Sequence, residues 1–454
     1  MIVTFSITNF RSFCGEETLS FVASKRLAGS HGNHATPIPD SNEKVLRTAV
    51  IYGANGAGKS NIVKALQYLQ TMALKTRDKS KGTGREAFRF GIVQAEPSIF
   101  DLQFITAGKL YRYGIKADDD NVLEEWLVQV MGAREQTLFE RKADVEAGVT
   151  VELAKHPKPS NRLKSLASVG GRANHTFLAF ATETLEKKDL GEELAVVIEW
   201  FRQQLTVIEP ASRFTGLASN LVYNSSFSEF AGAFLRSAST GVNQLIVQRS
   251  EIEEEELRKT LPDGVVDRLL THDREAGKSS AFNMHSGEEV RMDPKTGKIM
   301  RFRVGAIHSH QPGQTVELDL SEESDGTRRL LDLTPALLSL QSRNAVVCID
   351  EIDRSLHPEL VRKFVEFFLE SCAGSRQLIV TTHETSLLDQ DLLRRDEIWF
   401  VEKDQAGASR VYSLLDFKVR KDLEIRKGYL QGRFGAVPFL GDIDRLMEMA
   451  APNE

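Results

Sequence analysis

Gly53-Ala-Asn-Gly-Ala-Gly58-Lys59-Ser60 is the most informative stretch of this chain. The short apolar run Thr48-Ala-Val-Ile-Tyr52 precedes it and predicts a buried strand. Residues 61–70 follow it with apolar side chains at helical spacing. Glycines let the backbone curl so that its N–H groups point at a phosphate, and a helix N-terminus favours that anion. The strand–loop–helix context therefore predicts a phosphate-binding loop.

Each polar side chain of this loop has a predicted task. Lys59 neutralises the β- and γ-phosphate oxygens, and Ser60 binds Mg²⁺. The predicted nucleotide-binding residues are Asn55, Gly56, Ala57, Gly58, Lys59, Ser60 and Asn61. We therefore expect ATP and Mg²⁺ as ligands.

The other half of this site lies far along the chain. Ala345-Val-Val-Cys-Ile349 predicts a strand that ends in Asp350, a ligand for Mg²⁺, and Glu351, which would polarise the attacking water. A second apolar strand, 377–382, ends in His383, whose imidazole would sense the γ-phosphate. Because parallel strands present their carboxyl ends at one edge of a sheet, these residues are expected to share one site.

A short hydroxyl-rich segment precedes the strand that ends in Asp350. Leu320-Ser-Glu-Glu-Ser324-Asp325-Gly326-Thr327 leads into residues 328–340, which have helical spacing. A hydroxyl side chain and a glycine at a helix start can bind an anion, but the same residues also suit an ordinary N-cap. The position of this segment, shortly before the strand that ends in Asp350, favours the anion site over an ordinary N-cap. There it resembles the signature motif of ABC-type ATPases, as a variant of Leu-Ser-Gly-Gly-Gln.

Three further segments carry a family resemblance. Ile7-Thr-Asn-Phe-Arg-Ser-Phe13 resembles the start of RecF/SMC-type ABC ATPases. Asp350-Glu-Ile-Asp-Arg-Ser-Leu-His-Pro358 resembles the Walker B and D-loop of the overcoming-lysogenization-defect branch. Tyr429-Leu-Gln-Gly-Arg-Phe-Gly-Ala-Val-Pro438 is similar to the ending of RloA-like abortive-infection ATPases. The chain thus resembles the RloA-like family of ABC-type AAA ATPases.

This resemblance implies an α/β fold, an ABC-type ATPase (P-loop) head with mixed sheets and a mainly helical insertion. It also implies an ATP-driven homo-oligomer with shared sites. Ser324, Gly326 and Thr327 of one subunit would face ATP held by Lys59 of another, and Asp353 in the D-loop would couple the two sites. Ser-Asp-Gly-Thr differs from Ser-Gly-Gly-Gln, which leaves the contacts of the third and fourth positions open.

The pattern along the chain predicts three parts: residues 1–150 and 298–454 as the two halves of the ATPase domain, and 151–297 as the mainly helical insertion. Alternating segments predict strands at 99–105, 111–115 and 124–130 and a hairpin over 298–320 that turns at Pro312-Gly313. Helical spacing marks 193–205 and 227–235, and Ser250 is a predicted N-cap for the acidic run 251–256.

Two further expectations concern the surroundings of the nucleotide. The polar loop from Leu27 to Asn42 is expected near the adenine. Gln94 is the one candidate for a Q-loop glutamine.

Composition narrows the class of protein. The 454 residues, 41% of them hydrophobic, can bury more than one core, and the net charge of −6 disfavours a general DNA-coating protein. One local basic cluster fits either a solvated loop or contact with nucleic acid or an acidic partner: Lys155, His156, Lys158, Arg162, Lys164 and Arg172. The three cysteines lack metal-ligand spacing. No apolar run is long enough for a signal sequence or membrane span, so we expect a cytoplasmic protein.

The leading interpretation is an ATPase, converting ATP and water to ADP and phosphate, in a prokaryotic antiviral (abortive-infection) system. No nuclease cluster is evident in the sequence, so a separately encoded effector of nuclease or Toprim type is expected as partner. The alternative is a RecF/SMC-like DNA-repair or chromosome-maintenance ATPase, with direct DNA contact left open. A transporter subunit is disfavoured by the opening segment 9–13, and Glu351 disfavours a non-catalytic scaffold.

Overall fold

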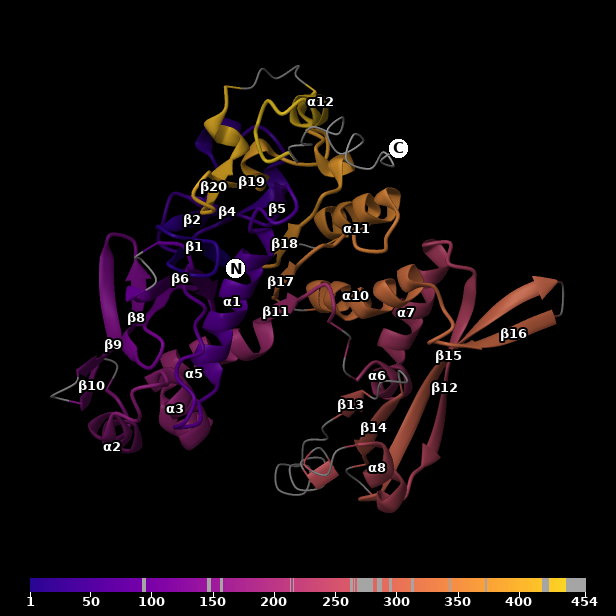
Figure 1. Cartoon of the computed structure of the whole chain (residues 1–454), viewed down its shortest axis with the longest axis horizontal. Coiled ribbons are helices and arrows are strands. Elements are labelled where there is room, and N and C mark those ends of the chain that lie inside the picture. The colour runs from indigo at the N-terminus through magenta and orange to yellow at the C-terminus, as the bar shows by residue number, and fades with distance from the viewer. Residues whose placement is uncertain are drawn as a thin grey trace, which may run out of the picture. The chain divides into compact units, whose positions relative to one another are not determined.

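The computed structural model describes most of the chain up to residue 437 (Figure 1). The residues outside the description are 92–94, 145–147, 156–157, 213, 215, 262–263, 265, 268–280, 284–287, 294–295, 312–313, 343, 372–373, 419–423 and 438–454. Gln94, His156 and the Pro312-Gly313 turn therefore lie outside the described residues.

The chain divides into two compact units, each assembled from separate segments. The first unit comprises Met1–Pro210, Arg343–Asp353 and Arg362–Glu454, and the second comprises Ala211–Ser342 and Arg354–Val361. This division differs from the predicted insertion over 151–297. Residues 151–210 belong to the first unit because their buried apolar side chains join its core.

A six-stranded sheet carries the phosphate-binding loop. Its order is β11 (Leu205–Ile208), β17 (Val346–Ile349), β18 (Gln377–Thr381), β5 (Thr48–Gly53), β19 (Ile398–Lys403) and β20 (Ser409–Ser413). The first five strands are parallel, and β20 pairs antiparallel with β19. All residues of β5, β17 and β18 are buried, as expected of parallel strands covered on both faces. The three strands predicted for the site are confirmed.

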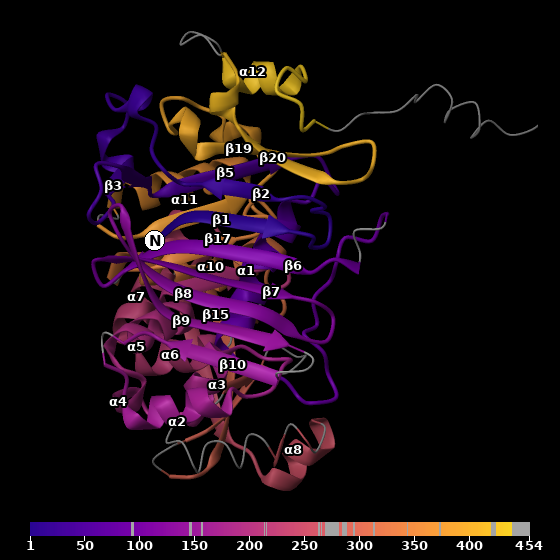
Figure 2. The same ribbon diagram turned by 90° about the vertical axis from the view of Figure 1, so that its left-hand side faces the viewer.

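The described residues of the first unit also form a second, antiparallel sheet and the short pair β3 (Ala35–Pro37) and β4 (Lys44–Leu46). Its order is β10 (Gly148–Leu153), β9 (Arg134–Asp144), β8 (Val122–Met131), β7 (Lys109–Ala117), β6 (Ser98–Thr106), β1 (Ile2–Thr8) and β2 (Glu17–Ser20). Figure 2 shows these strands side by side. The predicted strands at 99–105, 111–115 and 124–130 are confirmed as parts of β6, β7 and β8.

Helix α1 (Lys59–Leu74) shares one hydrophobic core with both sheets. Its Leu66 and Leu69 lie in the same buried cluster as Ile51 of β5 and Phe100 of β6. The remaining helices of this unit include α2 (Asn161–Val169), α3 (Phe177–Thr184), α4 (Lys187–Leu190), α5 (Glu192–Glu199), the π-helix Trp200–Gln204 and α12 (Ile425–Leu430). The predicted helix at 193–205 ends earlier, since Leu205 begins β11.

The second unit combines helices with its own antiparallel sheet. The sheet order is β12 (Val242–Glu251), β15 (Ile299–Gln311), β14 (Glu289–Met292) and β13 (Ala281–Asn283), and β16 (Gln314–Asp319) also pairs with β15. The helices are α6 (Leu217–Tyr223), α7 (Ser225–Ser237), α8 (Glu254–Thr260) and α10 (Asp325–Ser342); α11 (Pro358–Ser371) spans both units. The hairpin predicted at 298–320 is confirmed by β15 and β16.

Ser250 is not an N-cap, which corrects that prediction. Strand β12 continues through Glu251, and Glu253 is the N-cap of α8. The backbone of Ser250 pairs with Arg301 in the sheet, so it cannot also begin a helix. The segment 151–297 thus contributes strands as well as helices.

Candidate functional site

The phosphate-binding loop follows β5 at the carboxyl end of the strand. Asn55 and Gly56 are exposed, Ala57 and Gly58 are buried, and Lys59 to Asn61 form the first residues of α1. Gly58 has φ of +118°, and a Cβ there would lie 2.2 Å from Ser409 Oγ. Only glycine therefore allows the chain to turn this tightly against β20.

Lys59 lies inside the loop with 6% of its surface exposed. Its Nζ donates to Gly53 O at 2.9 Å and Ala54 O at 3.2 Å, and lies 2.9 Å from His383 Nε2. Burial lowers the pKa of Lys59, while the carboxylates of Asp350, Asp353 and Glu351 oppose that shift. The ammonium group thus has only neutral acceptors among these contacts, at a place where an anion would stabilise its charge.

Asp350 follows β17 and is 1% exposed. Thr381 Oγ1, at the end of the neighbouring β18, donates to Asp350 Oδ1 at 2.5 Å. The backbone N–H of Asp350 donates to Ile208 O at the end of β11, at 2.9 Å. Neighbouring strands therefore fix both the backbone and the carboxylate of Asp350 at the carboxyl edge of the sheet.

Glu351 has a left-handed backbone conformation with φ of +48°. This conformation costs a residue with a side chain about 1–2 kcal/mol. Thr381 Oγ1 accepts a hydrogen bond from Glu351 N at 2.8 Å, which helps to hold the strained residue in place. The turn gives Glu351 a partly exposed position next to the buried Asp350, as a residue acting on water requires.

His383 and Asp353 meet at the end of β18. Asp353 Oδ1 accepts from Thr382 Oγ1 at 2.9 Å, and its Oδ2 accepts from the backbone N–H of His383 at 3.3 Å. Burial and then the charge of Lys59 lower the pKa of His383. A neutral imidazole is consistent with an Nε2 that accepts from the Lys59 ammonium. The structure thus brings together Lys59, Asp350, Asp353 and His383, which lie far apart in sequence.

Two serines brace the phosphate-binding loop from outside. Ser12 Oγ accepts from Asn61 Nδ2 at 2.7 Å and lies 2.7 Å from Ser409 Oγ. Ser409 Oγ also lies 2.5 Å from Ala57 O. The segment 9–13 and the start of β20 therefore both contact the loop.

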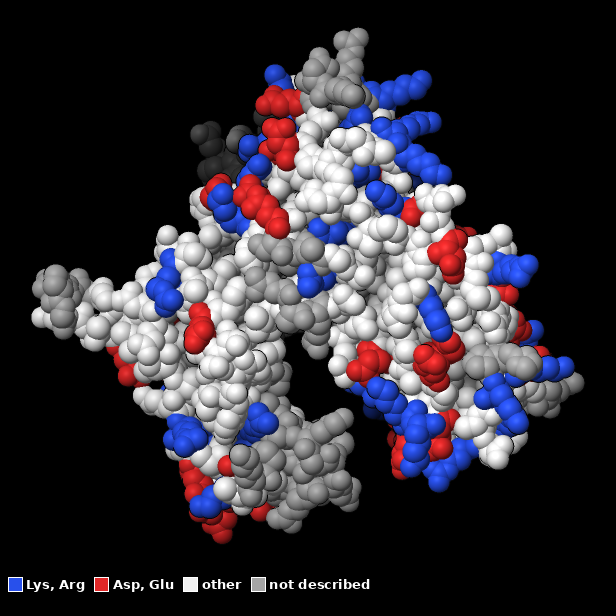
Figure 3. Space-filling model, turned by 180° about the vertical axis from the view of Figure 1, so that it is seen from behind, with Lys and Arg blue, Asp and Glu red and all other residues white. Residues whose placement is uncertain are grey.

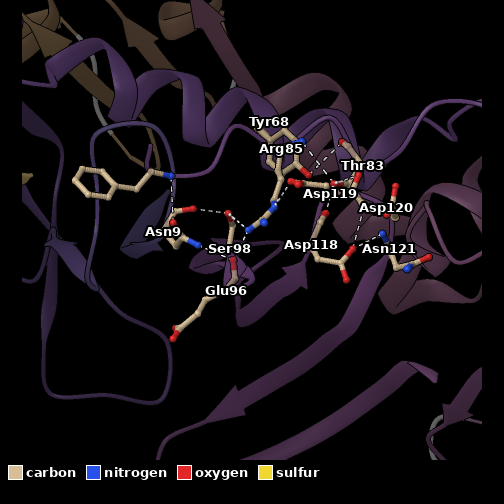
Figure 4. Close-up of polar contacts among 11 residues, drawn as sticks. Asn9, Tyr68, Thr83, Arg85, Glu96, Ser98, Asp118, Asp119, Asp120 and Asn121 are labelled. Atoms are coloured by element: carbon tan, nitrogen blue, oxygen red, sulfur yellow. Dashed lines mark hydrogen bonds and ion pairs between the residues drawn. The ribbon is translucent and has the colours of Figure 1, made fainter. Parts of the chain in front are cut away.

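The segment between α1 and β6 is tied to the same opening segment (Figure 4). Asn9 Nδ2 donates to Glu96 O at 2.6 Å, and Arg85 Nη1 donates to the same carbonyl at 2.5 Å. Arg85 Nε also forms an ion pair with Asp119 Oδ1 at 2.7 Å. These contacts hold Arg85 and Glu96 beside the segment 9–13, which itself contacts the phosphate-binding loop.

The predicted signature residues lie in the second unit, at the start of α10. Exposed Ser324 accepts a hydrogen bond from Thr327 N at 3.1 Å, and the two hydroxyls lie 2.9 Å apart. A Cβ at Gly326 would lie 2.8 Å from Ser355 O, so this position is confined. Ser324 thus acts as an N-cap of α10, and its exposed position leaves its hydroxyl accessible from solvent.

Ser60, at the start of α1, and Asp350, directly after β17, offer the kinds of oxygen ligand that a magnesium site uses. Mg²⁺ in phosphate-binding sites is held by one or two protein oxygens together with substrate phosphates and water. Within the described residues, no group of three or more His, Cys, Asp or Glu is arranged to hold a metal by itself. The hydroxyl and carboxylate donors match the oxygen ligands that Mg²⁺ prefers.

Sequence reasoning missed the contributions of Thr381, Thr382, Ser12 and Ser409. The two threonines stand directly before His383, where hydroxyl side chains at a strand end are themselves a usable signal. Ser409 carries no local signal, because its partner Ser12 lies 397 positions away.

The loop from Leu27 to Asn42 lies at the other end of the parallel sheet, which corrects the expectation that it neighbours the adenine. His34 Nδ1 is 3.0 Å from Glu397 Oε2, and Glu397 stands directly before β19. Arg47, directly before β5, donates its N–H to His34 O at 2.8 Å. These contacts fix the loop at the amino ends of strands whose carboxyl ends carry the phosphate site.

The face drawn in Figure 3 carries side chains of both charges. Blue and red side chains are interspersed over the face drawn in Figure 3. Within the basic cluster, Arg162 pairs with Asp189 at 2.8 Å. In the part of the chain that the structure describes, no helix combines the length and apolar character needed to cross a membrane.

Comparisons with known proteins place the chain among ATPase-type domains. The family described as "AAA domain, putative AbiEii toxin, Type IV TA system" matches residues 49–153 and 171–389. These ranges cover more than half of the chain, so the chain belongs to this family. No curated protein matches it.

Solved structures with a distant likeness are heads of SMC proteins. The SMC head domain from Thermotoga maritima is 15% identical, with 91% of this chain and 98% of that chain covered and a TM-score of 0.37. An SmcHead bound to the C-winged helix domain of ScpA is 13% identical, with 91% and 97% covered and a TM-score of 0.40. The likeness is too distant to say anything of activity or partners.

Proposed function

We propose that this member of the AAA-domain family binds ATP with Mg²⁺ and hydrolyses it to ADP and phosphate at the carboxyl edge of its parallel sheet. One observation carries the proposal. The Lys59 ammonium, 2.9 Å from His383 Nε2, shares one edge with two carboxylates, Asp350 and Asp353, that adjacent threonines hold in place. Phosphate oxygens accept stronger hydrogen bonds than the carbonyls and imidazole that now hold Lys59.

The proposed roles follow from the geometry. Asn55 to Asn61 bind the phosphates, with Lys59 neutralising their charge, and Ser60 with Asp350 holds Mg²⁺, which supplies further charge neutralisation when bound. Glu351 activates water from its partly exposed position. His383 exchanges its contact with Lys59 for one with the γ-phosphate.

The active form is a homo-oligomer in which two chains complete each site. Ser324 of one subunit, with Gly326 and Thr327, contacts the ATP held by another, and Asp353 couples the sites. The exposure of Ser324 supports this arrangement, since its hydroxyl is accessible to a second molecule.

The biological role that we infer is antiviral defence of the abortive-infection type. The family description names a putative toxin of a toxin–antitoxin system, and the sequence of residues 429–438 resembles the ending of RloA-like ATPases. The ATPase would control a separately encoded effector of nuclease or Toprim type in the cytoplasm. The second candidate is a RecF/SMC-like repair ATPase, which the segment Ile7–Phe13 favours.

Loss of Lys59 tests the assignment of the site. Lys59→Ala removes the only charge that the loop contributes, and ATP binding measured by calorimetry is expected to weaken about hundredfold or more. Lys64→Ala removes a lysine from the same helix and serves as the matched control, with wild-type affinity expected. Equal affinity in wild type and Lys59→Ala would exclude this ATP site.

Partner capture separates the two biological roles. A Glu351→Gln chain loaded with ATP serves as bait for the products of neighbouring reading frames. Retention of a nuclease or Toprim protein supports the defence role. ATP-dependent binding to DNA without such a partner supports the repair role, and DNA cleavage by the purified chain alone would contradict the proposed division of labour.

A further inference from the structure

Phe90 is a large aromatic side chain that lies exposed at the surface of the first unit. Its surface is 62% exposed, although burial would stabilise a phenyl ring. The ring packs on Gly407, where an added Cβ would lie 3.3 Å from its Cε2 atom. Gly407 has φ of +81° and forms the turn between β19 and β20. The absence of a side chain at this turn leaves room for the ring of Phe90.

The segment that carries Phe90 is fixed by contacts of its neighbouring residues. Phe88 is buried and contacts Phe90 edge to face, with ring centroids 5.5 Å apart. The N–H of Phe88 donates to Asn9 Oδ1 at 3.1 Å, and Arg11 N donates to Glu86 O at 2.7 Å. Figure 4 shows how Asn9 is held in turn by the Glu96 carbonyl. Phe90 is therefore presented to solvent by a fixed support.

The same support reaches the phosphate-binding loop. Ser409, two residues after Gly407, lies 2.5 Å from Ala57 O through its hydroxyl. Its N–H donates to Ser12 O at 2.7 Å, and Ser12 in turn accepts from Asn61 at the start of α1. One continuous set of contacts within the first unit thus connects Phe90 to the phosphate-binding loop.

We infer that Phe90 is the stacking platform for the base of the nucleotide whose phosphates occupy this loop. The inference rests on the proposed nucleotide site and adds its base-binding part. A nucleobase stacks on an aromatic face through its π-system, and every base offers such a face. The platform therefore recognises a planar base without selecting its edge, so ATP and GTP are expected to benefit alike.

Three ligands separate base stacking from phosphate binding: ATP, GTP and inorganic tripolyphosphate, each titrated with Mg²⁺ by calorimetry. Phe90→Leu keeps an apolar side chain and removes the ring. It is expected to weaken ATP and GTP about tenfold and to leave tripolyphosphate binding unchanged. Phe90→Trp retains a stacking face and is expected to bind both nucleotides as tightly as wild type.

The matched control is Tyr223→Leu, which removes a 58% exposed ring from the second unit and should change none of the affinities. Unchanged ATP affinity in Phe90→Leu, or an equal loss for tripolyphosphate, would overturn the stacking role. Lys59→Ala distinguishes this failure from that of the site itself. If wild type binds ATP and Lys59→Ala does not, the phosphate site stands whatever Phe90 does.

Discussion

The carboxyl edge of the parallel sheet and the start of α10 carry the two predicted halves of the ATP site, and they differ in how their polar groups are held. At the sheet edge, side chains from different strands fix one another, as Thr381 fixes Asp350 and Thr382 fixes Asp353. At α10, the described hydrogen bonds of Ser324 connect it to its own helical turn.

This difference has a physical consequence. Buried groups that hydrogen-bond to one another are preorganised. Little free energy is therefore needed to order them when a ligand binds. A self-capped serine on an exposed helix start is equally well formed without a ligand. The polar groups of the sheet edge are thus ordered within one chain before the proposed nucleotide binds, whereas the start of α10 would gain a further contact only from another molecule.

The largest expected effect is at Glu351. Glu351→Gln keeps the size of the side chain and removes its basicity, so ATP hydrolysis should slow about hundredfold or more while ATP binding persists. Steady-state phosphate release and ATP titration measure the two quantities. Glu255→Gln, an exposed glutamate on α8, is the control and should hydrolyse at the wild-type rate. A rate in Glu351→Gln equal to wild type would remove the general-base assignment.

A smaller effect is expected at Ser324, and it tests most directly how the sheet edge and the start of α10 differ. Ser324→Arg places a bulky charge where a neighbour's ATP would lie, and hydrolysis should fall about tenfold or more with ATP binding retained. Ser321→Arg changes an exposed serine in the same turn region and should leave the rate unchanged.

Mixing Ser324→Arg with Lys59→Ala subunits then asks whether the site is shared. One composite site of each mixed dimer has an intact Lys59 from one chain and an intact Ser324 from the other. Partial recovery of phosphate release is expected. No recovery, with subunit exchange verified, would mean that the start of α10 does not complete a neighbour's site.

The sequence allowed the chemistry-bearing strands to be predicted because parallel strands covered on both faces are continuous apolar runs. The runs ending at Gly53, Ile349 and Thr381 are such strands, and the polar residues after them have to meet at one edge. Strand β12 escaped prediction for the opposite reason. It lies at the edge of its sheet, most of its residues are exposed, and its apolar residues 245–247 are consecutive and do not alternate with polar ones.

Other parts of the site depend on contacts that no local pattern encodes. The positive φ of Glu351 is imposed by its surroundings, including Thr381, thirty positions away. The position of Phe90 likewise involves a contact with Gly407, which belongs to a distant turn. Such features arise from the packing of remote segments and become visible only in the folded chain.

The smallest expected effect is the pH dependence of stability contributed by His383. Burial and the nearby Lys59 lower its pKa in the folded chain, whereas the unfolded chain has the ordinary value of 6.5. The unfolded state therefore binds a proton more readily, and folding is penalised as the pH falls through and below 6.5. Asp350, Asp353 and Glu351 act in the opposite direction and keep the penalty modest.

His383→Gln removes this penalty and retains a side chain that can accept from Lys59. The difference in thermal midpoint between wild type and His383→Gln should therefore shift in favour of the variant, by a few degrees at most, between about pH 8 and about pH 5. His357→Gln, at an exposed histidine, is the control and should show a smaller shift. A difference that stays constant over this range would mean that burial and Lys59 do not lower the pKa of His383 in the folded chain, and that the sheet edge is less preorganised than its hydrogen bonds indicate.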